Sequence, residues 1–242
     1  MTSLRGPVIV TGTDTGVGKT VVTAAIAAAA TQAGLRVAVL KPAQTGGDCD
    51  AGVVRRLAAP TTVDTMVAYP DPLAPLTAAR VADVAPLVLG DVLSTMERLA
   101  GEHELVLVEG AGGLLVPLGG AGWTAADLAV AVGAPAVVVV RAGLGTLNHT
   151  ALTLEALERR EVPAVTVIGS WPAEPELVHR TNISDLAGEL AGALPERAGA
   201  LEPPVFRASA PGWLGPDLYG TFDPTAFRAA NLAPTDAYLP GR

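Results

Sequence analysis

The stretch VTGTDTGVGKT, residues 10–20, decides the fold of this chain. The short apolar run before it, residues 7–10, is typical of a strand, and the Ala-rich segment after it, residues 21–33, is typical of a helix. A glycine-rich turn between a strand and a helix, closed by Lys-Thr, is the pattern of a phosphate-binding P-loop. Backbone N–H groups can surround phosphate oxygens there, and the helix N-terminus adds its positive dipole. The stretch therefore predicts a nucleoside triphosphate site.

The pattern gives each position of this loop a role. Lys19 is expected to reach the outer phosphates and the Thr20 hydroxyl to bind Mg²⁺. One position departs from G-x-x-x-x-G-K-[ST], because Thr13 stands where the first Gly belongs and Gly12 lies one residue too early. A turn that binds nothing is the alternative, but the strand, the helix and the Gly-Lys-Thr ending together favour nucleotide binding. The expected nucleotide-binding residues of the loop are Gly16, Val17, Gly18, Lys19, Thr20 and Val21.

Composition limits the other functions that the chain can have. The 242 residues suit one α/β domain, and 50% hydrophobic with 17% charged residues indicates a globular chain. A net charge of -8 argues against a nucleic-acid or anionic-membrane surface, so we expect neither partner. The single cysteine, Cys49, excludes an internal disulfide framework, and three histidines without ligand spacing argue against a zinc site. With no signal-peptide pattern and no apolar run long enough to cross a bilayer, we expect a cytoplasmic protein.

Five Val-rich runs are apolar at consecutive positions, which is typical of strands buried on both faces of a parallel sheet. They are residues 8–11, 36–40, 104–109, 134–141 and 164–168. Helix-like segments lie at residues 20–33, 50–59, 91–100, 124–132, 146–160 and 175–190. The alternation predicts an α/β fold with a doubly wound, mostly parallel sheet and helices on both faces. Ligands of such sheets gather at the carboxyl ends of the strands.

No internal repeat or second domain is visible, so residues 1–242 are expected to form a single P-loop domain. The stretch YPDPLAP, residues 69–75, is a Pro-rich connection, too rigid for a helix interior. Residues 203–242 are rich in Pro and Gly, with one helix-like segment at 224–231. This tail is expected to pack on the core or to stay partly loose.

Glu109 ends an apolar run and is followed by Gly110, Ala111 and Gly112. A carboxylate at a strand end is what a P-loop enzyme uses to hold Mg²⁺, directly or through water. The glycines let the backbone pass close to a phosphate or a substrate. A solvated Glu at a turn is the alternative, but beside a P-loop we favour the metal role.

A second polar stretch, KPAQTG at residues 41–46, follows the second strand-like run. Lys41 and the Thr45 hydroxyl could hold an anionic intermediate, although an ordinary solvated Lys is also possible. Asp48 and Asp50 come next and either could supply a second Mg²⁺ ligand; Cys49 between them is expected to be an inert thiol.

The segment AGLGTLNHT, residues 142–150, follows the run at 134–141 and enters a helix. Exposed N–H groups at the N-terminus of that helix could hold a carboxylate without Arg or Lys. Simple helix capping by Thr146 or Asn148 explains the same residues. His149 is expected to be a surface residue of the first turn.

Together these motifs resemble the dethiobiotin synthetase family. The matching pieces, in order, are GTDTGVGKT (12–20), KPAQTG (41–46), VEGAGGLLVPL (108–118) and LGTLNHT (144–150), within residues 8–170. The resemblance implies a biotin-pathway ligase that uses ATP, or another nucleoside triphosphate, and Mg²⁺. One amine of 7,8-diaminononanoate takes up CO2 as a carbamate, the γ-phosphate passes to it, and the second amine closes the ring, giving dethiobiotin, ADP and phosphate.

The resemblance also implies residue roles. Lys41, Lys19 and Thr15 match catalytic positions, Thr45 matches a substrate hydrogen-bonding position, and Thr20, Asp50 and Glu109 match the Mg²⁺ ligands. Pro72 and Pro75 fall in the substrate-lining loop. Gly145, Thr146, Leu147 and Asn148 match the helix N-terminus that takes the substrate carboxylate from the partner subunit, which implies a homodimer with shared sites.

One stretch departs from the family. Many members read the adenine edge with an Asn-Asp pair after the fifth strand, but here the residues are Gly169, Ser170, Trp171 and Pro172. Base recognition would then depend mostly on backbone groups, with Trp171 either covering the base or packed elsewhere. The sequence therefore leaves the base preference open.

Three other classes of protein are alternatives to this family. A partition-type switch ATPase would carry a signature Lys five residues before Lys19, where this chain has Asp14. A cobyrinate-type amidotransferase would need a glutaminase domain with a nucleophilic Cys, for which the chain is too short. An inactive scaffold that keeps the fold is the third, and a product-formation assay would separate it, since the motif residues themselves are intact.

Overall fold

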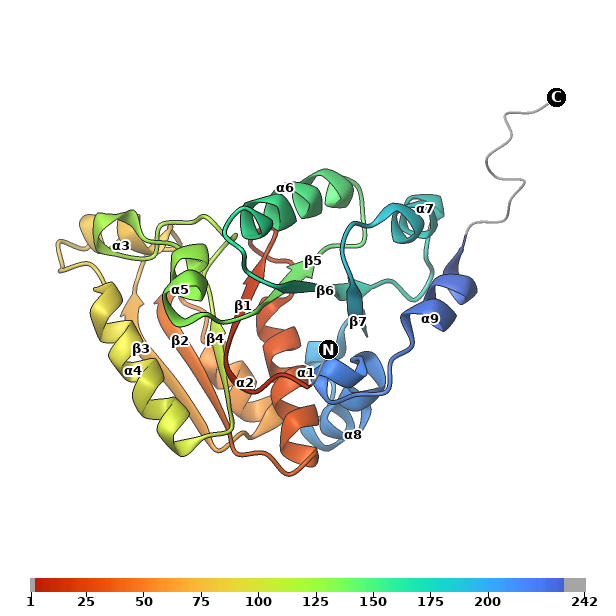
Figure 1. The fold of residues 1–242 in the computed structure, drawn as a ribbon, viewed down its shortest axis with the longest axis horizontal. Helices are drawn as coiled ribbons and strands as arrows, with labels where there is room; N and C mark the ends of the chain where they lie inside the picture. The colour runs from red at the N-terminus through yellow and green to blue at the C-terminus, as the bar shows by residue number, and fades with distance from the viewer. Residues whose placement is uncertain (1–2, 233–242) are drawn as a thin grey trace.

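A single parallel sheet runs through the computed structural model, which describes residues 3–232 (Figure 1). Its order is β3-β2-β4-β1-β5-β6-β7, and all the paired strands are parallel. The parallel, doubly wound fold predicted from the Val-rich runs is confirmed. The strands are β1 (Gly6–Gly12), β2 (Val37–Thr45), β3 (Thr62–Tyr69), β4 (Leu105–Glu109), β5 (Ala136–Val140), β6 (Ala164–Trp171) and β7 (Leu190–Pro195).

Helices cover both faces of this sheet (Figure 1). On one face α1, α2 and α8 share a core with the sheet, and on the other face α4, α5, α6 and α7 do so. Helix α3 lies beside β2 and β3, and α9 contacts α7 and β7. The helices are α1 (Lys19–Gln32), α2 (Asp50–Ala58), α3 (Pro75–Val81), α4 (Leu89–Glu102), α5 (Ala125–Val132), α6 (Thr146–Glu158), α7 (Leu177–Asp185), α8 (Pro203–Trp213) and α9 (Pro224–Asn231).

The composition of α1 explains its central place. Every residue from 24 to 30 is buried, and all but Ile26 are Ala. Small side chains let the helix lie between the sheet, α2 and α8 without leaving an exposed polar face. The P-loop in front of α1 is thereby held on a rigid element.

Two strands and two helices were not predicted. The segment expected to be helical over residues 175–190 is helical only in α7, and β7 begins at Leu190. Strand β3 was missed because it lies at the sheet edge, where its polar positions stay partly exposed. Helix α3 starts at Pro75, so part of the Pro-rich connection is the first turn of a helix, where proline fits.

The first part of the Pro- and Gly-rich tail is ordered on the core. Pro203 and Pro204 occupy the first turn of α8, and Phe206 is fully buried against α1 and α2. The predicted helix at residues 224–231 is confirmed as α9. The remaining tail residues, 233–242, lie outside the described residues. Within residues 3–232 no helix is both long enough and apolar enough to span a bilayer.

The order of the strands fixes where a ligand can bind. Strand β1 lies between β4 and β5, so the chain leaves it toward α1 at the point where the strand order reverses. In doubly wound sheets this crevice at the carboxyl ends is the usual binding place. The residues after β1, β2 and β4 meet there.

Candidate active site

The P-loop starts directly after β1. The Thr13 N–H donates to the Val139 carbonyl of β5 at 3.0 Å, which fixes the loop against the sheet. Gly18 precedes α1 with φ 98°, a left-handed backbone that favours glycine. Lys19 and Thr20 are therefore the first two residues of α1, and their side chains lie at its N-terminus, beside the positive end of the helix dipole.

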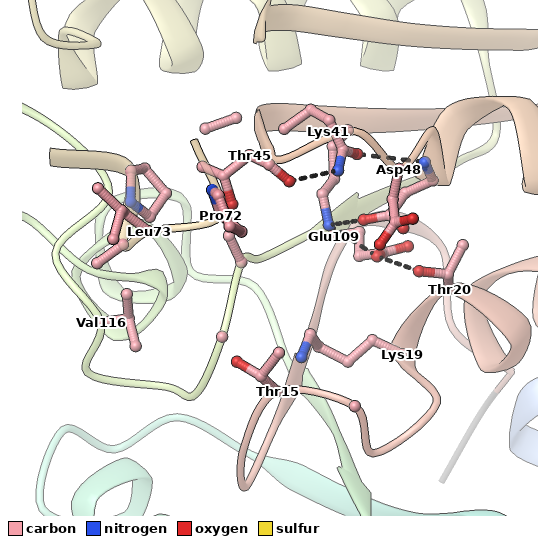
Figure 2. A pocket seen from close by; sticks show the side chains of 18 of the residues that line it. Thr15, Lys19, Thr20, Lys41, Thr45, Asp48, Pro72, Leu73, Glu109 and Val116 are labelled. Atoms are coloured by element: carbon pink, nitrogen blue, oxygen red, sulfur yellow. Dashed lines mark hydrogen bonds and ion pairs between the residues drawn. The ribbon is translucent and has the colours of Figure 1, made fainter. Parts of the chain in front are cut away.

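A pocket of about 550 Å³ opens at this N-terminus. Figure 2 shows Lys41 and Glu109 directed toward one another, Thr20 beside Glu109, and Thr15 and Lys19 across the pocket. Pro72 and Leu73 form another part of its wall. The predicted residues that line it are Thr15, Gly16, Gly18, Lys19, Thr20, Val21, Lys41, Thr45, Asp48, Asp50, Pro72, Pro75, Glu109, Ala111 and Gly112.

Lys41 and Glu109 form the charged centre of the pocket. Lys41 Nζ lies 2.8 Å from Glu109 Oε1 and 2.6 Å from Asp50 Oδ2. The Thr20 hydroxyl donates to the same Glu109 oxygen at 2.8 Å. The side chains of Lys41 and Glu109 are only 5% and 2% exposed, so this contact is shielded from solvent. Of the two acids left open by the sequence, Asp50 is the one that contacts Lys41.

The two lysines differ in their electrostatic surroundings. Burial lowers the pKa of Lys41, but Glu109 and Asp50 outweigh that effect and the net pKa is raised above its usual 10.5. Burial also lowers the pKa of Lys19, the nearby Lys41 charge adds to this, and the acids only partly compensate, so its pKa falls below 10.5. Lys41 is thus a firmly held cation, and Lys19 is a cation that gains from an anionic ligand.

These are the chain's only lysines. The other 14 of its 16 basic residues are arginines, so lysine occurs nowhere outside this pocket. A compact ammonium on a flexible stem differs from a planar guanidinium in reach and in pKa. This count was available from the sequence and would have singled out both residues without any motif.

Thr15 and Lys19 are both hydrogen-bonded to Asp14. Lys19 Nζ donates to the Asp14 carbonyl at 2.9 Å, and the Asp14 carboxylate accepts the Thr15 N–H at 2.7 Å. The cation expected to contact phosphate is therefore anchored by the loop's own backbone.

Several lining residues were not predicted: Ala43, Gln44, Leu73, Ala74 and Val116. Gln44 has a clear task, because its Oε1 accepts the Asp50 N–H at 3.2 Å and so helps to orient the start of α2. Cys49 caps this helix, its sulfur accepting the Gly52 N–H. An Asn, Asp or Gln near a predicted helix start is the signal that could have revealed the Gln44 contact.

Other predicted residues lie away from the pocket lining. Val17 is buried, and Gly110 follows β4 with its N–H bonded to the Val10 carbonyl at 2.9 Å. Gly169 packs against the P-loop, since a Cβ on it would stand 1.9 Å from the Val17 carbonyl oxygen. Ser170 is exposed, whereas the Trp171 ring is buried and packs on Phe227 with centroids 5.1 Å apart.

The predicted carboxylate-binding turn is also outside this pocket. Gly145 precedes α6, and Thr146 is buried with its hydroxyl 3.4 Å from that of Thr150. Leu147 is partly exposed and Asn148 is exposed, close to Leu144, a residue that is 87% exposed.

The donors beside Lys41 suit a hard divalent cation. The two carboxylates of Asp50 and Glu109 already converge on one ammonium, and the Thr20 hydroxyl adjoins them. Oxygen donors of this kind are those that Mg²⁺ prefers, with phosphate oxygens completing the shell. Among residues 3–232 no group of three or more His, Cys, Asp or Glu forms a separate metal cluster.

Solved structures share this fold at low identity. The septum site-determining protein MinD with Mg-ADP from Pyrococcus horikoshii is 17% identical, with a TM-score of 0.56, over 87% of this chain and 95% of that one. A ParA family ATPase from Chlorobium tepidum is 12% identical, with a TM-score of 0.53, over 90% and 96%. These likenesses show the fold alone.

Sequence comparison gives the family. A family model described as an AAA domain matches residues 7–203. ATP-dependent dethiobiotin synthetases from Streptomyces avermitilis and Streptomyces coelicolor are 54% and 52% identical, covering 92% and 90% of this chain and 97% and 96% of the relatives. A third, from Rhodococcus jostii, is 54% identical over 85% of this chain and 93% of its own. Identity above one half across nearly the whole of both chains means that the protein belongs to the ATP-dependent dethiobiotin synthetase family.

Proposed function

We propose that the protein converts 7,8-diaminononanoate, CO2 and ATP into dethiobiotin, ADP and phosphate. The observation that carries this proposal is the convergence of both lysines with Asp50 and Glu109 in the P-loop pocket. A carbamate and a triphosphate are both anions, so their reaction needs fixed positive charge between them. The pocket offers that charge on two separate elements, α1 and β2.

The reaction forms three bonds. One amine of the diamine first adds to CO2, loses a proton and becomes the carbamate. A carbamate oxygen attacks the γ-phosphorus, the bond to ADP breaks, and a carbamic–phosphoric anhydride forms. The second amine then attacks the carbamate carbon, loses a proton and expels phosphate as the ring closes. Mg²⁺, held by Thr20, Asp50 and Glu109, would offset charge on the phosphates.

The chain's own residues bind and orient these groups. Lys19 lies at the start of α1 for the outer phosphates, and Lys41 is a buried ammonium that can hold the carbamate. Thr15 in the P-loop and Thr45 at the end of β2 line the same pocket and can donate hydrogen bonds to carbamate and substrate. Pro72 and Pro75 would enclose the aliphatic part of the diamine.

Phosphate release tests the function directly. Purified protein with bicarbonate, Mg²⁺ and ATP is expected to release phosphate only when the diamine is added, with one dethiobiotin formed per phosphate. Phosphate release that does not depend on the diamine would instead indicate a switch ATPase, whose fold the solved structures share. An inactive scaffold would release none in either case.

A homodimer with shared sites is part of this proposal. The turn formed by Gly145, Thr146, Leu147 and Asn148 does not line the pocket of its own chain, so it is free to take the substrate carboxylate in a partner's pocket. The exposed Leu144 beside it supports burial at a subunit contact. Light scattering should give a dimer for the natural protein and a monomer for Leu144→Asp; a dimer in both would remove the support from Leu144.

Loose base selectivity also belongs to this proposal. The residues at the expected base position, Gly169 and Ser170, offer mostly backbone groups, and the Trp171 ring is buried against Phe227. Turnover with ATP, CTP and GTP at equal concentration measures the preference. We place the reaction in the cytoplasm, where ATP is available. The net charge of -8 argues against a nucleic-acid partner.

A further inference from the structure

We propose that Arg141 is a positioning residue for the P-loop, which acts by neutralising Asp14 and so allows the triphosphate to bind. Arg141 directly follows β5, and its Nη2 lies 2.8 Å from Asp14 Oδ2, although 127 residues separate the two in sequence. The inference rests on the P-loop role proposed above. It adds a residue that no motif of the sequence singles out.

Asp14 connects three parts of the site. Its second carboxylate oxygen accepts the Thr15 N–H at 2.7 Å, and its carbonyl accepts Lys19 Nζ at 2.9 Å. Turning the Asp14 side chain away would therefore release the Thr15 N–H and disturb the peptide that holds Lys19. Arg141 fixes the outer oxygen, and the Thr13 N–H bond to Val139 fixes the loop to the same strand.

The charge of Asp14 is unfavourable where it stands. Asp14 belongs to the P-loop, which is expected to surround an anionic triphosphate. Its negative charge is close enough to Lys19 to raise the pKa of that lysine, against the lowering effect of burial. An unpaired carboxylate here would repel the triphosphate. Arg141 is the cation that the structure places on this carboxylate, so it offsets the repulsion while Asp14 keeps its hydrogen bonds.

The stem of Arg141 has a second, purely structural contact that the test must separate. Arg141 lies beside Thr146, Ile168 and Trp171, and its Nε is buried. Truncation to Ala would remove this packing as well as the charge. Arg141→Met keeps most of the stem and removes only the guanidinium, and Arg141→Lys keeps the charge.

Calorimetric titration with ATP and Mg²⁺, without the diamine, measures the effect whether or not the protein makes dethiobiotin. We expect Arg141→Met to weaken ATP binding about three- to tenfold, because a partly exposed charge is only partly screened. Arg141→Lys should bind within about twofold of the natural protein. In turnover, the KM for ATP should rise while the KM for the diamine stays unchanged.

The double variant separates charge from packing. Adding Asp14→Asn to Arg141→Met removes the unpaired charge and keeps an acceptor for the Thr15 N–H, so ATP affinity should recover. Asp14→Asn alone should bind ATP at least as tightly as the natural protein. Arg98→Met, which breaks a surface pair with Asp64 on α4 and β3, is the matched control and should bind normally.

Three results would overturn the proposal: natural ATP affinity in Arg141→Met, no recovery in the double variant, or weaker binding by Asp14→Asn alone. If Arg141→Met does not fold, as judged by its thermal transition, the comparison of Asp14→Asn and Arg141→Lys with the natural protein still decides. A protein that binds ATP as expected but makes no dethiobiotin would contradict the function and leave this inference standing.

Discussion

Lys41 Nζ lies 2.8 Å from a carboxylate oxygen of Glu109, and both side chains are almost completely buried. Burying an ion pair costs desolvation free energy that the attraction only roughly repays, so stability alone does not explain why the pair is kept. Its value lies in holding a charged ammonium in a fixed place before substrate arrives. The pair also allows the effects of replacing Lys41 or Glu109 to be predicted.

Replacing Lys41 with Ala should nearly abolish ring closure. The ammonium is the fixed positive charge closest to Glu109, and without it the carbamate has no cation on the β2 side. We expect kcat to fall about a thousandfold, as is typical when a charge-stabilising group is lost. ATP affinity, measured by calorimetry, should stay within about threefold, because Lys19 and the loop backbone still bind the phosphates. Turnover that survives this change would contradict the carbamate role of Lys41.

Mg²⁺ and Lys41 should compete for the same two carboxylates. Lys41→Met leaves Glu109 buried without its cation, which is expected to lower the free energy of unfolding by about 3 kcal/mol. A divalent ion can replace the missing charge, so saturating Mg²⁺ should raise the melting temperature of Lys41→Met more than that of the natural protein. Mn²⁺ binding without nucleotide, followed by electron paramagnetic resonance, should also be tighter in this variant.

Glu109→Gln is the control for that competition. It removes one of the two proposed carboxylate ligands, so Mg²⁺ should no longer stabilise it appreciably. Equal Mg²⁺ effects on the natural protein, Lys41→Met and Glu109→Gln would show that the metal binds elsewhere.

The two lysines should titrate on opposite sides of pH 10.5. Protein labelled with ¹⁵N at lysine Nζ has only two lysine side chains to observe, because the chain contains no others. Lys19, whose pKa is lowered by burial and by Lys41, should lose its proton below pH 10.5, and Lys41, held by Glu109 and Asp50, above it. The reverse order would contradict the assignment of roles.

Stability should follow the same directions. The raised pKa of Lys41 means that its contribution is complete below pH 10.5 and is lost as the pH rises through its folded value. The lowered pKa of Lys19 means that its charge costs stability below the folded value, a cost that disappears toward pH 10.5. At pH 7 the free energy of unfolding, measured by urea denaturation, should therefore be larger for Lys19→Met than for the natural protein, although this variant should bind ATP poorly.

A helix or strand could be predicted from the sequence where local signals mark both of its ends. Strand β1, the P-loop and α1 were predicted to within a few residues because glycines and Gly-Lys-Thr separate an apolar run from an Ala-rich one. Strand β7 was not, since LAGALP is short, contains Gly and follows a helix, so its strand character depends on pairing with β6. Helix α8 was hidden by its prolines, two of which occupy the first turn.

Some contacts of the site could likewise be predicted from the sequence, and others could not. Lys19, Lys41 and Glu109 stand at strand ends or in motifs, and their meeting follows from the parallel topology. The contact of Asp50 with Lys41 depends on the path of the loop between them. The contact of Arg141 with Asp14 joins the segments that follow β5 and β1, which are far apart in sequence. Such pairs follow from tertiary packing and leave no local pattern.

Gly169→Ala should impair nucleotide binding although Gly169 does not line the pocket. A Cβ there would stand 1.9 Å from the Val17 carbonyl oxygen and 2.8 Å from a methyl of Val139, so either β6 or the P-loop must shift. We expect a loss of about 1–3 kcal/mol in the free energy of unfolding and a higher KM for ATP. Gly90→Ala, on α4 with nothing within 4 Å of the new methyl, should instead be neutral or stabilising by up to about 1 kcal/mol. If Gly169→Ala binds ATP as the natural protein does, the P-loop tolerates displacement by β6, and the close approach of these two segments has no part in holding the phosphates.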